Sequence, residues 1–297
     1  ILVTLFTGIL LGLASGVNAL TALHIGSKDD EGLKRTVHTA VIICLAGGIL
    51  ITVFGILFSH NILALMNTKD ELIDGAVLYL RIYLLGMPAL GLYNFGNAVL
   101  SAAGDTKRPL YYLAFAGVVN VILNLFFVIV CHLGVAGVAL ASMISQFISA
   151  FLILRALLTG KEKYCLHLSE IRFAKRKAVG ILQIGIPSAF QYSLFAFANL
   201  FVQSSVNSFD HVLVEGNSAA ANADPLVYDM MAAFYTACGS FMGQNYGAGK
   251  RKRVRNSYLV SLAYSFGIGT IGGIALVIFG RQFLGLFTND PAVVDAG

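Results

Sequence analysis

The chain has 297 residues, of which 57% are hydrophobic and only 12% are charged, with a formal net charge of +5 at pH 7. Water-soluble domains carry about 25% charged residues, so a soluble fold of this length would lack the charges to cover its surface. The apolar residues form long blocks without the alternation of barrel strands, which excludes a membrane β-barrel and indicates membrane-crossing helices.

The membrane-crossing segments can be read from the distribution of charge. Six stretches contain no Asp, Glu, Lys or Arg: 1–26, 36–68, 82–104, 109–154, 178–209 and 256–280. A helix of about 20 apolar residues crosses a bilayer, and the longest block breaks at the turn-like sequence 131–134. The stretch 218–242 is a weaker candidate because Asp224 and Asp229 lie in it. We therefore predict eight spans, at 1–26, 37–58, 76–104, 110–131, 133–157, 179–208, 218–243 and 257–280.

The loops between these spans alternate in charge. Of the 20 Lys and Arg residues, all except Lys69, Arg81, Arg155 and Arg281 lie in the first, third, fifth and seventh loops. Cytoplasmic loops are enriched in Lys and Arg, so the odd-numbered loops are predicted to be cytoplasmic and residue 1 to lie on the outer side. The basic residues then set topology and contact anionic lipid, and no nucleic-acid partner is expected.

The basic stretch "FMGQNYGAGKRKRVR" (241–255) looks at first like a phosphate-binding loop. A Walker A loop needs a glycine five positions before its Gly-Lys pair and a Ser or Thr after the lysine. Gln244 and Arg251 occupy those two positions, so a nucleotide site is not expected.

The same stretch belongs to an internal repeat. "IGSKDDEGLKRTV" (25–37) aligns with "MGQNYGAGKRKRV" (242–254), and "LFSHNILALMNTKDELIDGA" (57–76) aligns with "IFGRQFLGLFTNDPAVVDAG" (278–297). Equivalent positions are separated by six predicted spans, an even number. The two halves are therefore predicted to be parallel repeats about an axis along the membrane normal, as in many transporters.

Five motifs in order carry a family resemblance: "GDTKRP" (104–109), "NVILN" (120–124), "GVAGVALASMISQ" (134–146), "IGIPSAFQ" (184–191) and "GQNYGAGK" (243–250). In this order and spacing, the chain resembles the multidrug and toxic compound extrusion (MATE) transporters over essentially its whole length. The resemblance implies an all-α integral membrane fold of twelve helices in two pseudo-symmetric six-helix lobes around a V-shaped cleft. Parts of each repeat lack a counterpart, so we expect a fragment with about eight transmembrane helices, family helices 2–9.

The resemblance also implies a division into lobes. Residues 1–158 are expected to form the N-terminal lobe with helices 2–6, 159–178 a cytoplasmic inter-lobe linker, and 179–297 the C-terminal lobe with helices 7–9. Apolar residues are mixed with basic ones in the linker, at Leu166, Leu168, Ile171 and Phe173. This pattern indicates either an amphipathic stretch on the membrane surface or a plain linker helix.

Polar side chains inside a membrane usually face a cavity or another helix. Asn94 and Asn97 are three residues apart and Asn120 and Asn124 are four apart, so each pair shares a helix face. The resemblance places these four and Ser142 at positions that form a cation site in one branch of the family, and oxygen ligands suit Na⁺. That branch often has Asp where Asn124 stands. The alternative is that these side chains only hold helices together.

The second lobe offers two further candidates, Gln191 and Asn199. Another branch of the family often carries a glutamate where this chain has Phe195, so the coupling site of that branch is not expected. Gln191 and Asn199 flank Phe195 on one helical stripe, and we expect them to line the cleft.

Asp224 and Asp229 are the carboxylates inside a predicted span. Pro225 follows Asp224, and Tyr228 lies one turn further on. One interpretation is a broken helix with an ion or proton site. The other is a helix start at the outer mouth, with Asp224 as cap and Pro225 in the first turn.

The resulting hypothesis is secondary-active efflux of amphipathic or cationic organic compounds by Na⁺ or H⁺ antiport and alternating access. The alternative is a lipid-linked glycan flippase. A flippase would need a strongly basic central cavity, and the sequence offers only Arg81 as a candidate cation within the membrane, which argues against it. No nucleophile–base pair or HExxH motif occurs in a span, so an enzyme is not expected. We expect a plasma-membrane monomer with a drug-like small-molecule substrate and lipid as partners, no resident metal, and no cofactor besides the coupling ion.

Overall fold

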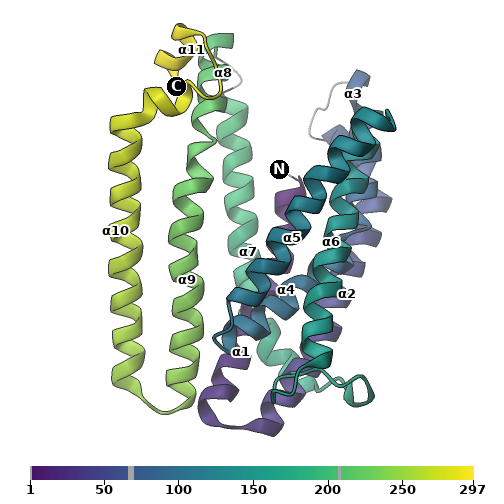
Figure 1. The fold of residues 1–297 in the computed structure, drawn as a ribbon, viewed down its shortest axis with the longest axis vertical. Coiled ribbons are helices and arrows are strands. Elements are labelled where there is room, and N and C mark those ends of the chain that lie inside the picture. Colours follow the sequence, from purple (N-terminus) through teal and green to yellow (C-terminus); the bar gives the residue numbers. More distant parts are fainter. Residues whose placement is uncertain (1, 66–69, 207–208) are drawn as a thin grey trace.

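A computed structural model describes residues 2–65, 70–206 and 209–297 of the chain, and these form long helices joined by short turns (Figure 1). The first part contains α1 (Leu2–Ser27), α2 (Asp30–Leu65), α3 (Asp70–Leu84), α4 (Met87–Ala102), α5 (Lys107–Leu125) with a π-helical continuation (Phe126–Val130), and α6 (Gly134–Thr159). The second part contains α7 (Lys175–Val206), α8 (His211–Ala220), α9 (Ala223–Gly247), α10 (Arg251–Leu284) and α11 (Pro291–Ala296).

The predicted spans correspond to these helices, except that α9 is not among the membrane-spanning candidates and the predicted span 76–104 is divided between α3 and α4. Within the described residues, six helices are long and apolar enough to cross a membrane, and the α3–α4 pair would make a seventh span. The predicted span 218–243 falls mainly on α9, which lies outside that set and runs beside α10 in Figure 1. The predicted span 179–208 corresponds to α7, and its last two residues lie outside the described part of the chain.

The predicted span 76–104 is not one helix. It is broken between α3 and α4, whose axes differ by 44°. Pro88 stands in the first turn of α4, where the backbone N–H of a residue has no partner within the helix, so proline is tolerated there. Because proline has no N–H, it cannot donate to a carbonyl of α3, and the helix does not continue across this point. At the break, a Cβ on Gly86 would lie 1.9 Å from Oε1 of Gln146, so the turn fits closely against α6.

α1 lies at the interface between the two halves of the molecule. It packs on α2 and α4 of the first half and on α7 and α9 of the second. Its glycines allow near backbone contact with α7, because a Cβ on Gly12 would lie 2.2 Å from the backbone nitrogen of Ala189, and a Cβ on Gly16 would lie 2.2 Å from the carbonyl oxygen of Ile181. Small residues at this spacing are the usual means of close helix packing in lipid.

Figure 1 shows the two groups of helices converging at one end and diverging at the other. The turns after α1, α4, α6 and α9 lie at the converging end, and these are the basic, odd-numbered loops of the sequence. Lys69, the exception in an even-numbered loop, lies outside the described residues. By the positive-inside rule, the converging end is the cytoplasmic end.

The linker between α6 and α7 lies along the cytoplasmic end of α2. His38 Nε2 lies 3.1 Å from both the backbone nitrogen and the carbonyl oxygen of His167, and the backbone N–H of Ala174 donates to Thr39 Oγ1 at 3.1 Å. Leu166 is buried, whereas Leu168 and Phe173 are exposed. The linker is mostly irregular, with one short 3₁₀ turn (Leu168–Glu170), so the interpretation as a plain linker helix is wrong.

The orientation gives a direct prediction. Lys250, between α9 and α10, lies at the basic end, whereas Cys131 is exposed in the opposite turn between α5 and α6. In intact cells, a membrane-impermeant maleimide should react with native Cys131 and leave a cysteine substituted at Lys250 unlabelled. Labelling of Lys250→Cys from outside, in a background with Cys131 replaced by serine, would show the topology to be inverted.

Candidate functional site

A cavity of about 550 Å³ lies between the two halves of the molecule. α1 and α4 form one wall, and α7, α9 and α10 form the other. Three tyrosines of the second half, Tyr192, Tyr235 and Tyr258, face amides and hydroxyls of the first. Among the described residues that line the cavity, none is Asp, Glu, Lys, Arg or His. The lining of the cavity is thus mainly apolar and aromatic, with a few amides and hydroxyls, and its described residues carry no charge.

Two of the amides predicted from the sequence line this cavity, Asn94 and Asn97 of α4. Asn97 Oδ1 accepts a hydrogen bond from Ser101 Oγ at 3.1 Å. Asn94 is only 5% exposed, and its Nδ2 has no hydrogen-bond partner among the described residues. A buried donor without a partner is costly, which indicates that a bound group or a water completes it.

Asn18 of α1 joins the two walls at one boundary of the cavity. Its Nδ2 donates to the carbonyl oxygen of Ala98 on α4 at 3.1 Å, and its Oδ1 accepts from Ser240 Oγ on α9 at 3.1 Å. Asn18 and Ser240 are each 8% exposed. One carboxamide therefore connects three helices, and one of its two bonds runs between the halves.

The cytoplasmic ends of α1 and α9 cross in backbone contact beyond this bridge. A Cβ on Gly26 would lie 1.9 Å from the carbonyl oxygen of Gln244, and a Cβ on Gly247 would lie 2.1 Å from the carbonyl oxygen of Leu23. Gln244 Nε2 also donates to the carbonyl oxygen of Ala102, at the end of α4, at 2.6 Å. These contacts close the molecule on the cytoplasmic side.

The other three predicted cation ligands form a separate cluster between α5 and α6. Asn124 Nδ2 donates to Asn120 Oδ1 at 3.0 Å, and Asn120 Nδ2 lies 3.4 Å from Ser145 Oγ. Ser145 Oγ donates in turn to the carbonyl oxygen of Ser142 at 2.8 Å, and the Ser142 hydroxyl donates to the carbonyl oxygen of Val138. None of these residues is among those that line the cavity.

One oxygen of this cluster accepts no hydrogen bond from the described residues. Asn124 Oδ1 is buried and has no hydrogen-bond partner among the described residues. Its own amide group is already directed at Asn120, so what remains at this point is a bare acceptor oxygen. Amide oxygens of this kind are ligands for hard cations such as Na⁺.

Gln191 and Asn199, predicted to line the cleft, are both exposed on α7 and are not among the residues that line the cavity. The neighbouring residue, Tyr192, occupies that place. Consecutive residues on a helix point about 100° apart, so the stripe that faces the cavity is displaced by one residue from the predicted one.

Asp224 and Asp229 lie on the exposed surface of α9. α9 begins at Ala223, which places Asp224 and Pro225 in its first turn, and the helix continues unbroken through Gly247. The broken-helix interpretation is therefore wrong, and the interpretation as a helix start is correct, with the acidic residue near the positive end of the helix dipole. Asn222, rather than Asp224, is the N-cap residue.

Tyr228 and Arg81, the remaining residues considered from the sequence, each contact a residue of a neighbouring helix. Tyr228 is exposed, and its ring lies 6.4 Å from that of Phe195 on α7, so these two rings connect α7 and α9. Arg81, the one candidate cation within the membrane, donates through Nε to the buried hydroxyl of Ser59 at 2.9 Å.

Sequence reasoning missed the residues that join the halves. Asn18 is an isolated amide in an otherwise apolar stretch, which is a weak signal, and Ser240 lies in a helix rich in small residues. Nothing in the sequence links two residues that are 222 positions apart. The cavity tyrosines were not indicated by the sequence either, because Tyr is common at both membrane–water interfaces and its presence in a span does not indicate a cavity.

Comparison with known proteins gives a consistent result. The profile of the MatE family matches residues 1–126 and 187–297. The relative named "Probable multidrug resistance protein YpnP", from Bacillus subtilis, is 29% identical over 289 residues. That alignment covers 97% of this chain, and the chain spans 64% of the length of the relative.

Solved structures resemble the fold over almost the whole chain. The outward-facing conformation of a multidrug resistance MATE family transporter of the MOP superfamily has a TM-score of 0.88 at 22% identity, covering 99% of this chain and 66% of that one. The inward-facing conformation of a transporter with the same description has a TM-score of 0.71 at 21% identity, covering 99% and 68%. The helix arrangement is thus closer to the outward-facing shape.

Proposed function

The chain belongs to the MatE family, the MATE transporters, and on this premise we propose that the protein exports amphipathic or cationic organic compounds by cation antiport. It is an all-α, multi-pass protein of the plasma membrane. The observation that carries the proposal is the uncharged, tyrosine-lined cavity between the two halves, which are closed against each other on the cytoplasmic side. A central cavity between two repeats, closed at one end, is the arrangement that alternating access requires.

The lining of the cavity supports an organic cargo. Tyr192, Tyr235 and Tyr258 offer ring faces that attract a cation, with a contribution of about 0.5–2 kcal/mol for each well-placed contact. The amides and hydroxyls of α1 and α4 offer hydrogen bonds to polar groups. A lipid diphosphate would need basic side chains, and the described lining has none, so no observation favours the flippase alternative.

The α5–α6 amide cluster supports cation coupling through the first lobe. The bare Oδ1 of Asn124 and the neighbouring oxygens of Asn120 and the Ser145 hydroxyl are ligands for Na⁺ rather than proton acceptors, because an amide does not take up a proton near neutral pH. We therefore expect Na⁺ to be the ion that this cluster serves.

The test is efflux of a fluorescent organic cation from cells that express the intact gene. Export should require an inward Na⁺ gradient. Asn120→Ala and Asn124→Ala, which each remove one oxygen ligand, should lower the Na⁺-dependent rate by about tenfold, the effect of losing one charge-assisted contact of ~1.4 kcal/mol. Surface expression should be unchanged.

The matched control is Asn256→Ala, an exposed asparagine at the cytoplasmic start of α10, which should transport normally. If both amide variants export at the normal rate, these asparagines only pack the helices. If efflux continues after both the Na⁺ and the H⁺ gradient are collapsed, the antiport proposal is wrong.

A further inference from the structure

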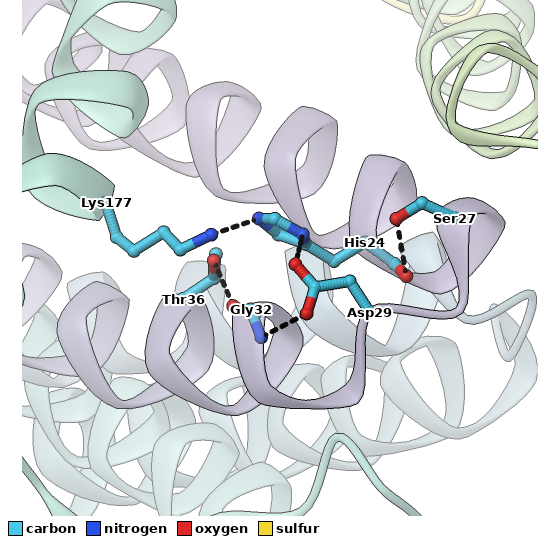
Figure 2. A network of polar contacts seen from close by, with 6 residues as sticks. All are labelled: His24, Ser27, Asp29, Gly32, Thr36 and Lys177. Atoms are coloured by element: carbon cyan, nitrogen blue, oxygen red, sulfur yellow. Dashed lines mark hydrogen bonds and ion pairs between the residues drawn. The ribbon is translucent and has the colours of Figure 1, made fainter.

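His24 lies at the cytoplasmic end of α1, where it connects the two halves of the molecule (Figure 2). Its Nε2 lies 2.8 Å from Nζ of Lys177, at the start of α7, and its Nδ1 lies 3.1 Å from Oδ2 of Asp29. His24 is 9% exposed, while Lys177 is half-buried. The imidazole is thus held between a cation of one half and a carboxylate of the other.

The partners fix the protonation state of the ring. An ammonium group only donates, so Nε2 must carry a lone pair to accept from Lys177. A carboxylate only accepts, so Nδ1 must carry the proton that is shared with Asp29. The contact between the halves therefore exists only with neutral His24, as the Nδ1–H tautomer.

Asp29 is itself fixed within the first half. It stands directly before α2, and its Oδ1 accepts from the backbone N–H of Gly32 at 2.8 Å, as an N-cap residue does. That N–H holds the pKa of the Asp29 carboxyl below its ordinary value. The carboxylate therefore stays charged throughout the pH range in which an imidazole titrates.

Gly32 packs closely against the Asp29–His24 pair. A Cβ on Gly32 would lie 2.0 Å from Oδ2 of Asp29 and 2.7 Å from Nδ1 of His24. Thr36 Oγ1 donates to the carbonyl oxygen of Gly32 at 2.7 Å, which holds this turn of α2 in place. Figure 2 shows Lys177 reaching the ring from the side opposite to Asp29.

The other charged groups near this cluster do not replace either partner. Arg35 of α2 acts on Lys177 as a like charge and is itself paired with Glu31. α9 also packs on this end of α1, and it presents Gln244 and Gly247 there, neither of which titrates. At the nearby end of α4, Asp105 is paired with Arg108.

We propose that His24, Lys177 and Asp29 form a proton-sensitive latch that holds the cytoplasmic ends of the two halves together. When His24 takes up a proton at Nε2, the new N–H and its positive charge face the ammonium of Lys177, and the bond between the halves becomes a repulsion. The imidazolium keeps its attraction to Asp29, which belongs to the same half. Acidification on the cytoplasmic side therefore loosens the closed end.

The sign of the pH dependence follows from this chemistry. The closed contact needs the neutral ring, so it is complete at neutral and alkaline pH and is lost when the pH falls far enough for the ring to take up a proton. The latch controls the closed end of the same cleft, so it rests on the proposed transport function. Its test measures a distance within the protein and does not require transport.

The experiment measures the distance between spin labels at the cytoplasmic end, placed at Lys107→Cys on α5 and Lys252→Cys on α10, both exposed positions, in the intact protein with its native cysteines replaced. Between about pH 8 and about pH 5.5, the ratio of open to closed populations should rise about fivefold, the upper end for a partly exposed charge contact. A wild-type ratio that does not change with pH overturns the proposal.

Two substitutions separate the latch from a general effect of acid. His24→Gln, whose amide can accept from Lys177 and donate to Asp29 but cannot titrate, should stay closed at every pH. Lys177→Gln removes the repelling charge and should abolish the rise. Lys175→Gln, an exposed lysine on the same turn of α7, should respond like the wild type. A full response in either His24→Gln or Lys177→Gln contradicts the latch.

Efflux at neutral pH distinguishes the two proposals. If a variant loses the pH response but still exports cargo, the latch has been removed and the transport function stands. If the wild type shows the distance change but exports nothing, the latch stands and the proposed function is wrong.

Discussion

Gly26→Ala is expected to prevent the cytoplasmic ends of α1 and α9 from closing. The added Cβ would lie 1.9 Å from the carbonyl oxygen of Gln244, a backbone atom that cannot rotate away. Overpacking of this kind costs about 1–3 kcal/mol, a factor of roughly 5–150 in the ratio of closed to open protein. The measurement is the distance between labels on the two halves, together with the initial rate of efflux, which should fall in parallel.

The control for this substitution is Gly117→Ala, on α5, where a Cβ would meet no atom within 4 Å. Alanine favours a helix over glycine by up to about 1 kcal/mol, so this variant should be neutral or slightly more stable. Gly247→Ala, which would bring a Cβ to 2.1 Å from the carbonyl oxygen of Leu23, should reproduce the Gly26 effect from the other side of the crossing. Normal closure in both variants would mean that the two helices do not meet here in the transport cycle.

Asn18→Ala is expected to uncouple the cavity from the closed end. The substitution removes the donor to the carbonyl oxygen of Ala98 and the acceptor for Ser240, both in a buried environment. Leaving a buried group without its partner costs about 1–3 kcal/mol, so the closed form should lose roughly 5–150-fold in population. The test is the efflux rate and the inter-lobe distance, each measured with and without cargo.

Two variants show whether this effect comes from the bridge. Ser15 lies on α1 one turn from Asn18 and also lines the cavity, so Ser15→Ala tests the loss of a polar group from the lining alone and should be mild. Ser240→Ala should give part of the Asn18 effect. A double-mutant cycle with Asn18→Ala should yield a coupling energy of about 0.5–3 kcal/mol, and purely additive effects would contradict the bridge.

The internal repeat gives these contacts a common origin. Gly26 and Gly243 are equivalent positions of the repeat, and in the structure the two copies lie against each other. A Cβ on Gly243 would lie 2.8 Å from Cβ of Ala22, on the helix that carries Gly26. The glycine–basic stretch that resembles a nucleotide loop is thus half of the contact that closes the cytoplasmic end.

The candidate site was predicted only in part. Asn94 and Asn97 were expected in a cation site of the first lobe, whereas they line the cavity between the halves. Asn120 and Asn124 were expected to share a face and are hydrogen-bonded to each other. The resemblance grouped all four with Ser142, whereas the structure divides them between the cavity and the α5–α6 cluster. Spacing along one helix determines which residues share a face, but it does not say which helix that face meets.

What the sequence indicated by itself was the membrane character and the helical class, together with the predictions of the orientation and of two related halves. These properties follow from local composition, the distribution of charge and self-similarity, and none of them depends on how helices cross. Only the tertiary structure decided where the predicted span 76–104 breaks, that Asp224 and Pro225 begin a helix, and that Asn18 meets Ser240 and His24 meets Lys177. Those outcomes depend on the approach of helices far apart in the chain, where a glycine or a single amide has its effect through a partner that no local pattern identifies.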